Sequence, residues 1–316
     1  MSTESDQPCA GIPVSATLLY RAHDAVVATT FLHALNDALK DEGETFEFAD
    51  ERIDDGFVFR GGRFTVVVTE AETALPRNAL GSALAHPFMD AVFPAGRAIA
   101  LGHAAHARVT VLGNSPGANI EPDADEIDES DFEPDAMLPR LRLLRTAANA
   151  FAKQRFPLAV HWEPCDHLMA GPDFVQLAER GAETELFVKA VPYSTDPEGG
   201  RAYGAVTNGA ASVIGREVEL AEAPVEASWA AHTLLQFVEQ ARSGVPAAGQ
   251  ALRFPNDEII LVHDEPASEL SPAGHVRLTV EKLPGSASVA NDRAESGMGF
   301  LNDMDKRVAA RGFGRR

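Results

Sequence analysis

Segments with a helical repeat of apolar residues alternate along the chain with segments that have a strand repeat, and this order limits the fold more than any other feature. In the segment 24–43 an apolar residue recurs every four positions, which predicts an amphipathic helix with the stripe Val27, Phe31, Leu35 and Leu39. Asp24 suits the N-cap of this helix and Gly43 its C-cap. The rest of the first half predicts strands at 15–21, 45–51 and 104–114, a hairpin over 55–72 with Gly61-Gly62 as its turn, and short helices within 77–93.

A similar alternation fills the second half of the chain. Its first helix, 135–154, is expected to be capped by Asp135 and to bury the stripe Leu141, Leu144, Ala148 and Phe151. The remaining segments predict helices at 170–181 and 223–244, and strands at 156–162, 185–194, within 204–223, at 256–265 and at 275–282. We therefore predict an α+β protein with two pseudo-repeated sheet units of the split β-α-β type, with helices packed on one face.

A run of carboxylates separates the two halves. Residues 115–136 hold nine Asp and Glu and neither Lys nor Arg, so this segment is expected to be a linker that buries little surface. The flanking α+β units are then 15–114 and 137–283. Residues 1–14 are expected to form a flexible arm, and residues 284–316 a flexible tail that ends in a basic peptide.

Charge and composition exclude several classes of protein. The 316 residues carry a formal net charge of −20, which disfavours nucleic acid as a partner and favours basic proteins. No apolar run approaches the length of a membrane span, and the N-terminus lacks the basic and apolar regions of a signal peptide. With only Cys9 and Cys165 there is no disulfide framework, so we expect a cytoplasmic protein without membrane insertion.

The stretch AVHWEPCDHL, residues 159–168, holds the densest group of reactive side chains. His161, Cys165 and His167 are candidates for a metal site or for a thiol nucleophile with its base. A zinc site usually needs a fourth ligand, and no second ligand cluster occurs. The third interpretation, which we favour, is a junction between a strand and a loop, ended by Pro164 and anchored in the core by Trp162.

Other motifs point to structure rather than chemistry. His103 and His106 lie outside any HExxH pattern, and on a strand they face opposite sides. The segment 204–220 contains glycines but neither a Walker loop nor a GxGxxG motif, and the chain has no kinase or CxxC motif. We therefore expect no cofactor and no resident metal.

A family resemblance accompanies these motifs. LAVHWEPCDHLMAGPDFVQLA and AVTNGAASVIGREVEL resemble segments of a bacterial family known as domain of unknown function 4261, and AAHARVTVLG resembles its mid-chain strand. The second match falls on Thr207, Gly209, Gly215, Glu217 and Glu219. The resemblance spans about residues 15 to 283, without the acidic linker and the basic tail. The family has no assigned activity, so the resemblance implies no catalytic residues.

Two functions follow from these observations. The first is a non-catalytic acidic interaction protein, such as an inhibitor, an immunity protein or an accessory factor that binds a basic protein partner in a toxin or secretion system. The tail supplies candidate partner-binding residues, namely Phe300, Leu301, Met304, Val308, Arg311, Phe313, Arg315 and Arg316. The alternative is a hydrolase or metal-dependent enzyme centred on Cys165, His161 and His167.

Overall fold

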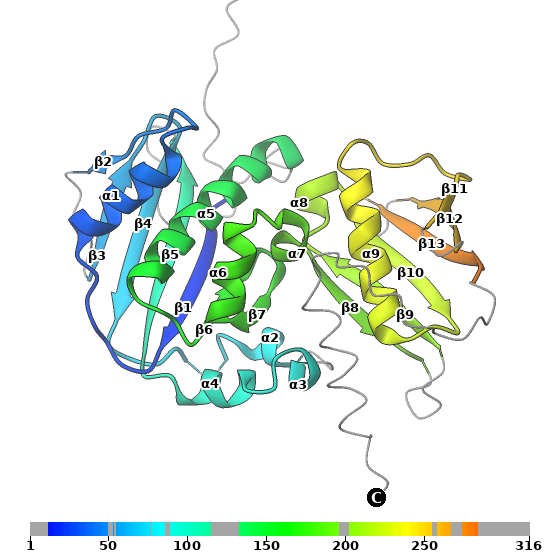
Figure 1. Ribbon diagram of the computed structural model, residues 1–316, viewed down its shortest axis with the longest axis horizontal. Helices are drawn as coiled ribbons and strands as arrows, with labels where there is room; N and C mark the ends of the chain where they lie inside the picture. Colours follow the sequence, from blue (N-terminus) through cyan, green and yellow to red (C-terminus); the bar gives the residue numbers. More distant parts are fainter. Residues whose placement is uncertain are drawn as a thin grey trace, which may run out of the picture. The chain divides into compact units, whose positions relative to one another are not determined.

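The fold is taken from a computed structural model, which describes residues 12–49, 53, 55–76, 78–85, 89–114, 133–195, 202–254, 258–266 and 274–283. The chain divides into two compact units, Met1–Phe187 and Val188–Arg316 (Figure 1), here called unit 1 and unit 2. Each contains one β-sheet with helices packed against it, which confirms the α+β class. No helix within the described ranges is both long and apolar enough to cross a membrane.

Unit 1 is built on a sheet of seven antiparallel strands in the order β2-β3-β4-β5-β1-β6-β7. Its strands are β1 Val14–Tyr20, β2 Glu47–Phe48, β3 Gly56–Arg60, β4 Phe64–Ala71, β5 Ala105–Gly113, β6 Ala159–Trp162 and β7 His167–Ala170. Its helices are α1 Ala28–Leu39, α2 Gly81–Ala85, α3 Met89–Val92, α4 Gly96–Gly102, α5 Pro134–Gln154, α6 Gly171–Glu179 and α7 Glu183–Phe187, with a 3-10 turn, Glu163–Cys165, between β6 and β7.

The larger hydrophobic core of unit 1 lies between the sheet and the helices α1, α5 and α6 (Figure 1). Aromatic rings fill it in two groups, which are Phe31 with Phe59 and Phe151, and Trp162 with Phe174 and Phe187. The predicted stripes of α1 and α5 are buried here, except for Val27, which lies at the N-cap of α1 and is exposed.

Helices also pack on the second face of this sheet, which the sequence did not predict. Leu19, Ala159 and Leu168 point to this face and contact Leu80 and Phe93 from the segment that carries α2 to α4. Every residue of β1, which lies between β5 and β6 in the sheet, is buried.

Unit 2 is built on a sheet of six strands in the order β11-β12-β13-β10-β9-β8. Only β10 and β13 pair in parallel, and all the other pairs are antiparallel. The strands are β8 Lys189–Tyr193, β9 Tyr203–Asn208, β10 Glu217–Ala223, β11 Ala251–Arg253, β12 Ile259–Glu265 and β13 His275–Lys282. The helices are α8 Ala211–Ile214 and α9 Ala227–Ala241, and α9 packs on β8, β9 and β10.

The boundary between the units differs from the sequence-based prediction. Residues 115–136 were expected to separate them, and 137–283 to form the second unit. Instead β6 pairs with β1, so the segment from α5 to α7 completes the first sheet and the chain divides after Phe187. The periodicity of a strand does not predict this boundary, because it does not indicate which other strand pairs with it. Residues 115–132, the arm before residue 12 and the tail from 284 lie outside the described residues.

Three local predictions were also wrong. Helix α5 begins at Pro134 with Glu133 at its N-cap, so Asp135 lies in its first turn and is not its cap. Helix α1 begins at Ala28 rather than after Asp24, because the backbone N–H of Val26 donates to Glu70 of β4 and holds the preceding segment extended. The β3–β4 turn is Gly62–Arg63 rather than Gly61–Gly62, since Gly61 donates its N–H to the Phe64 carbonyl. The Glu44 carboxylate fixes this register by accepting from the backbone N–H of Arg63 at 3.0 Å.

Candidate functional site

The stretch 159–168 forms a tight β-hairpin that separates its three reactive side chains. Trp162 pairs with His167 and His161 pairs with Leu168, so the two imidazoles point to opposite faces of the sheet. Cys165 lies in the turn between them, is 1% exposed, and donates its thiol to the Leu186 carbonyl at 3.7 Å. The structure therefore does not bring His161, Cys165 and His167 together.

His161 instead belongs to a polar cluster on the second face of the unit 1 sheet. We name this cluster, formed by Thr17, Arg108, His161, Glu163 and Asp166, the β1–β6 polar cluster. Thr17 pairs across the sheet with both Arg108 and His161. The Glu163 carboxylate accepts from the Thr17 hydroxyl and from the Arg108 guanidinium, each at 2.7 Å. His161 Nε2 lies 2.8 Å from Asp166 Oδ1, and Asp166 adopts a left-handed backbone conformation with φ 51°.

The hydrogen bonds of this cluster limit its chemistry. An imidazole oriented by a carboxylate is the usual arrangement of a general base, but a nucleophile must also donate to that imidazole. The Thr17 hydroxyl donates to Glu163 instead, and the Ser15 and Thr110 hydroxyls bond to each other at 2.9 Å. Within the described part of the chain, no three His, Cys, Asp or Glu side chains are grouped so that they can hold a metal ion. The cluster therefore joins β1, β5 and β6 without an assembled nucleophile.

Sequence reasoning missed four of the five members of this cluster. Glu163 and Asp166 stand beside His161 in the sequence, so their proximity was a usable signal. Thr17 and Arg108 are far from His161 along the chain, and only the strand order brings them together.

The paired histidines His103 and His106 are structural. His103 is buried, its Nε2 accepts the backbone N–H of Leu75 at 2.8 Å, and its Nδ1 therefore donates to the Ala100 carbonyl. His106 lies on β5, and its Nδ1 is 2.8 Å from the carbonyl oxygen of Thr73. Both side chains therefore hold the segment 73–75, which follows β4, against the end of α4 and the start of β5.

The residues of unit 2 that carry the family resemblance also have structural roles. The Glu217 carboxylate accepts from the Thr207 hydroxyl at 2.6 Å and from the backbone N–H groups of Gly209 and Ala211 at 2.9 and 3.2 Å. Glu219 accepts from the Tyr193 hydroxyl at 2.7 Å, and burial together with this hydrogen bond raises the pKa of Tyr193. Glu217 therefore fixes the turn that leads into α8.

A buried charged cluster lies where β1 ends. The Arg155 guanidinium stacks on the Tyr20 ring at 4.0 Å, donates to the Ala22 carbonyl, and lies 3.7 Å from the Glu70 carboxylate. Glu70 also accepts the backbone N–H of Val26, yet burial is the larger effect and raises its pKa. This cluster holds the segment between β1 and α1 against β4.

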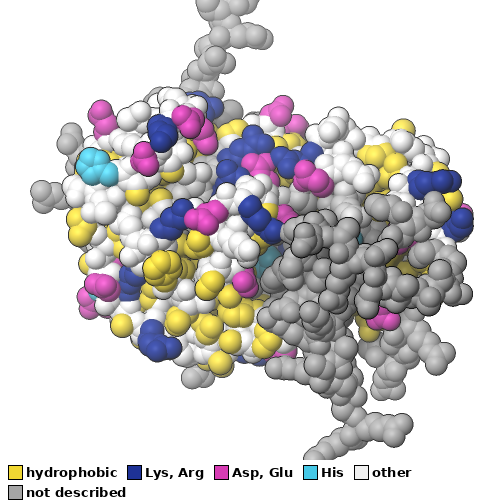
Figure 2. All heavy atoms as spheres, viewed as in Figure 1, with side chains coloured by type: hydrophobic (Ala, Val, Ile, Leu, Met, Phe, Trp, Pro, Cys, Tyr) yellow, Lys and Arg dark blue, Asp and Glu magenta, His cyan; other side chains and the backbone are white. Residues whose placement is uncertain are grey.

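Three basic side chains of α5 are paired with carboxylates. Arg142 and Arg145 donate to Glu183 at 2.8 and 3.2 Å, and Lys153 lies 2.8 Å from Glu179. Figure 2 shows Lys and Arg side chains interleaved with Asp and Glu over the helices of unit 1. This helical face therefore presents mixed charge rather than a continuous positive surface.

Three exposed carboxylates lie in the segment that runs from the end of α1 into the edge strand β2. The turn after α1 carries Asp41 and Glu42, and the edge strand β2 consists of Glu47 and Phe48. Phe48 packs on Phe59 with ring centroids 5.1 Å apart, yet its side chain is 48% exposed. We name this segment, with its exposed residues Asp41, Glu42, Glu47 and Phe48, the acidic edge; Arg60 of β3 is the register partner of Glu47.

The backbone of the acidic edge points outward at one residue, Phe48. Ala49 donates its N–H to the Val58 carbonyl of β3, and hydrogen-bonded residues alternate along an antiparallel strand. The N–H and C=O of Phe48 therefore point away from β3, toward the edge of the sheet. Such groups are the template on which a further strand can pair.

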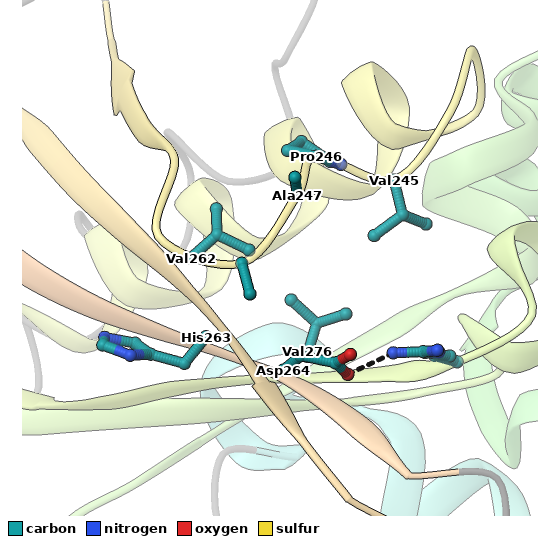
Figure 3. A pocket seen from close by; sticks show the side chains of 9 residues that line it. Val245, Pro246, Ala247, Val262, His263, Asp264 and Val276 are labelled. Atoms are coloured by element: carbon teal, nitrogen blue, oxygen red, sulfur yellow. Dashed lines mark hydrogen bonds and ion pairs between the residues drawn. The ribbon is translucent and has the colours of Figure 1, made fainter.

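Unit 2 contains a cavity of about 300 Å³ (Figure 3). The segment after α9 lies on one side of it and β12 and β13 on the other, and its lining residues are Arg216, Val245, Pro246, Ala247, Ala248, Val262, His263, Asp264 and Val276. Arg216 donates to Asp264 at the edge of this cavity, while the His263 imidazole points away and lies 2.8 Å from the Thr279 hydroxyl.

Comparison of the chain with protein-family models, with curated proteins and with solved structures found no match. The resemblance to domain of unknown function 4261 therefore stays a prediction. The predicted partner-binding residues, Phe300 to Arg316, lie outside the described residues.

Proposed function

We propose that the protein is a non-catalytic acidic interaction protein that binds a basic protein partner in a bacterial-type cytoplasm, as an inhibitor, immunity protein or accessory factor of a toxin or secretion system. The observation that carries the proposal is the acidic edge. It combines an outward-pointing strand backbone, the exposed ring of Phe48, and the carboxylates Asp41, Glu42 and Glu47.

This combination suits a partner that presents a basic extended segment. Backbone hydrogen bonds to an edge strand supply affinity, and the side chains beside them supply specificity. A Lys or Arg of the partner is attracted by the carboxylates, and an apolar residue of the partner covers the Phe48 ring. Opposite charges also accelerate the encounter, in a manner that added salt weakens.

The arrangement around Cys165 supports a role without catalysis. Its thiol is buried and bonded to a backbone carbonyl, and the hydroxyl nearest to His161 donates to a carboxylate. An enzyme centred on His161, Cys165 and His167 needs these groups to converge on one substrate atom, and the hairpin places them apart.

The test is an affinity capture from an extract of the cells that make the protein, with the tagged full-length chain as bait. We expect one or more basic proteins to be retained, and to be released by about 0.5 M salt, at which exposed charges are strongly screened. The double variant Asp41→Lys, Glu47→Lys should lose them. The control Glu226→Lys, Glu281→Lys changes two exposed carboxylates elsewhere by the same net charge and should retain them.

A third bait that ends at Leu283 separates the edge from the tail. Retention by this shortened chain assigns the contact to the acidic edge, whereas its loss assigns the contact to the predicted tail residues. The absence of any specifically retained protein, from every bait, contradicts the proposal.

A further inference from the structure

The cavity of unit 2 has a preformed aliphatic wall. The segment that follows α9 turns back at 247–250 and pairs with β12, since Gly249 donates its N–H to the Val262 carbonyl at 2.8 Å and Val262 donates to the Gln250 carbonyl at 3.0 Å. The Gln250 side chain also accepts the N–H of Ala247 at 3.3 Å. These bonds fix Val245, Pro246 and Ala247 above the strands before any ligand binds (Figure 3).

The opposite side of the cavity joins an apolar floor to one carboxylate. Val262 and Asp264 lie two residues apart on β12 and so point to the same face, and Asp264 is paired in register with Val276 of β13. Figure 3 shows Val262 and Val276 directed into the space below Pro246, with Asp264 at its margin. Val262 and Val276 are 1% and 2% exposed, so a ligand in this space meets exposed aliphatic surface at Val245 and Ala247 and charged groups at Asp264 and Arg216.

The charged groups are one cation and one anion. The side chains of Arg216 and Asp264 bond to each other, and they are 40% and 54% exposed, so each keeps hydrogen-bonding capacity toward the cavity mouth. A singly charged ligand is attracted by one of them and repelled by the other. A zwitterion satisfies both, because its ammonium group donates to Asp264 while its carboxylate accepts from the Arg216 guanidinium.

We propose that this cavity binds a small zwitterion with an aliphatic side chain, namely a free aliphatic amino acid. Its charged head lies between Arg216 and Asp264, and its side chain packs against Val245, Pro246 and Ala247. The volume of about 300 Å³ is at the small end of the range of ligand pockets, which suits a ligand of this size. The site is separate from the acidic edge, which belongs to unit 1.

The test is calorimetric titration of the full-length protein with leucine and with two molecules that each lack half of its head. Isoamylamine lacks the carboxylate and 4-methylpentanoate lacks the ammonium group. We expect leucine to bind with a Kd of about 1 mM or tighter, and each half-molecule to bind at least about tenfold more weakly, which corresponds to about 1.4 kcal/mol. Equal binding of all three, or no heat from leucine at about 10 mM, overturns the proposal.

Variants place the binding in the cavity. Asp264→Asn and Arg216→Gln should each weaken leucine binding at least about tenfold. The matched control is Glu265→Gln, which removes the neighbouring carboxylate, 3.8 Å from Arg277 on the opposite face, and should leave the Kd unchanged. Thermal unfolding of each variant verifies that it is folded. An Asp264→Asn protein that is folded and binds leucine as well as the wild type also overturns the proposal.

Discussion

The contact between Phe187 and Trp162 gives the sharpest prediction about the stability of unit 1. Both side chains are fully buried, and their rings are stacked with centroids 5.6 Å apart and planes 10° apart. Phe187→Ala removes the ring from this core, for which buried Phe→Ala changes cost about 3–5 kcal/mol. Phe187→Leu keeps most of the volume and loses the aromatic pair, so we expect a smaller cost of about 1–1.5 kcal/mol.

Equilibrium unfolding in urea measures these costs. Trp162 contacts the altered residue and is one of two tryptophans, so its fluorescence reports on this region. With a urea dependence of about 2 kcal/mol per molar, a loss of about 4 kcal/mol moves the transition of unit 1 by about 2 M. The control is Phe156→Ala, the same substitution at a side chain that is 79% exposed, which should change stability by less than about 0.5 kcal/mol. A Phe187→Ala protein no less stable than Phe156→Ala refutes the assignment of this core.

Three further predictions concern groups that the structure holds inside the units. Cys165 should react with a thiol reagent at least about 100-fold more slowly in the native protein than in urea, because the hairpin must open before the thiol can react. Mass spectrometry of the Cys165 peptide measures the labelling rate, and rapid labelling of the native protein contradicts the burial of this thiol. Burial raises the pKa of Glu70 above 4.5, so its protonated form favours folding; this stabilisation is complete below pH 4.5 and is lost as pH rises through the folded-state pKa. The free energy of unfolding of Glu70→Gln, minus that of the wild type, should therefore increase as pH rises from 4.5 through the folded-state pKa of Glu70. Urea titrations at several pH values measure this difference, and a difference that does not change with pH contradicts the prediction. Glu217→Ala should cost about 1–3 kcal/mol because it leaves the N–H groups of Gly209 and Ala211 without their acceptor, and Glu281→Ala, at an exposed carboxylate, should cost less than about 0.5 kcal/mol in the same unfolding assay.

Much of the local structure followed from the sequence because periodicity reports burial directly. The stripes that contain Phe31 in α1 and Phe151 in α5 both face the core of unit 1. Trp162, predicted as an anchor, is fully buried between Phe174 and Phe187. In these cases one face of an element is apolar and the other is polar, so the pattern alone fixes which residues are buried.

The neighbours of each strand did not follow from the sequence. The apolar residues of β6 predict a buried strand equally well in either unit, and nothing in its own sequence identifies β1 as its partner. The β1–β6 polar cluster could not be predicted for the same reason, since Thr17 and Arg108 approach Glu163 only through the order of the strands. Charged side chains that bond across a sheet therefore need the topology before they can be found.

The hairpin at residues 159–168 shows why proximity in sequence is a poor guide to a shared site. A tight turn between antiparallel strands sends alternate side chains to opposite faces, so residues that end one strand and begin the next are adjacent in space yet can be divided by the sheet itself. His161 and His167 are divided in this way, while Asp166, from the turn, reaches His161. A site on either face must therefore recruit its other members from distant strands, as His161 does with Thr17 and Arg108. Thr17 and Arg108 bond to Glu163, and His161 bonds to Asp166, so these side chains satisfy one another. Among the described residues, polar groups directed to solvent are present at Phe48 of the acidic edge in unit 1 and at the Arg216–Asp264 pair in unit 2.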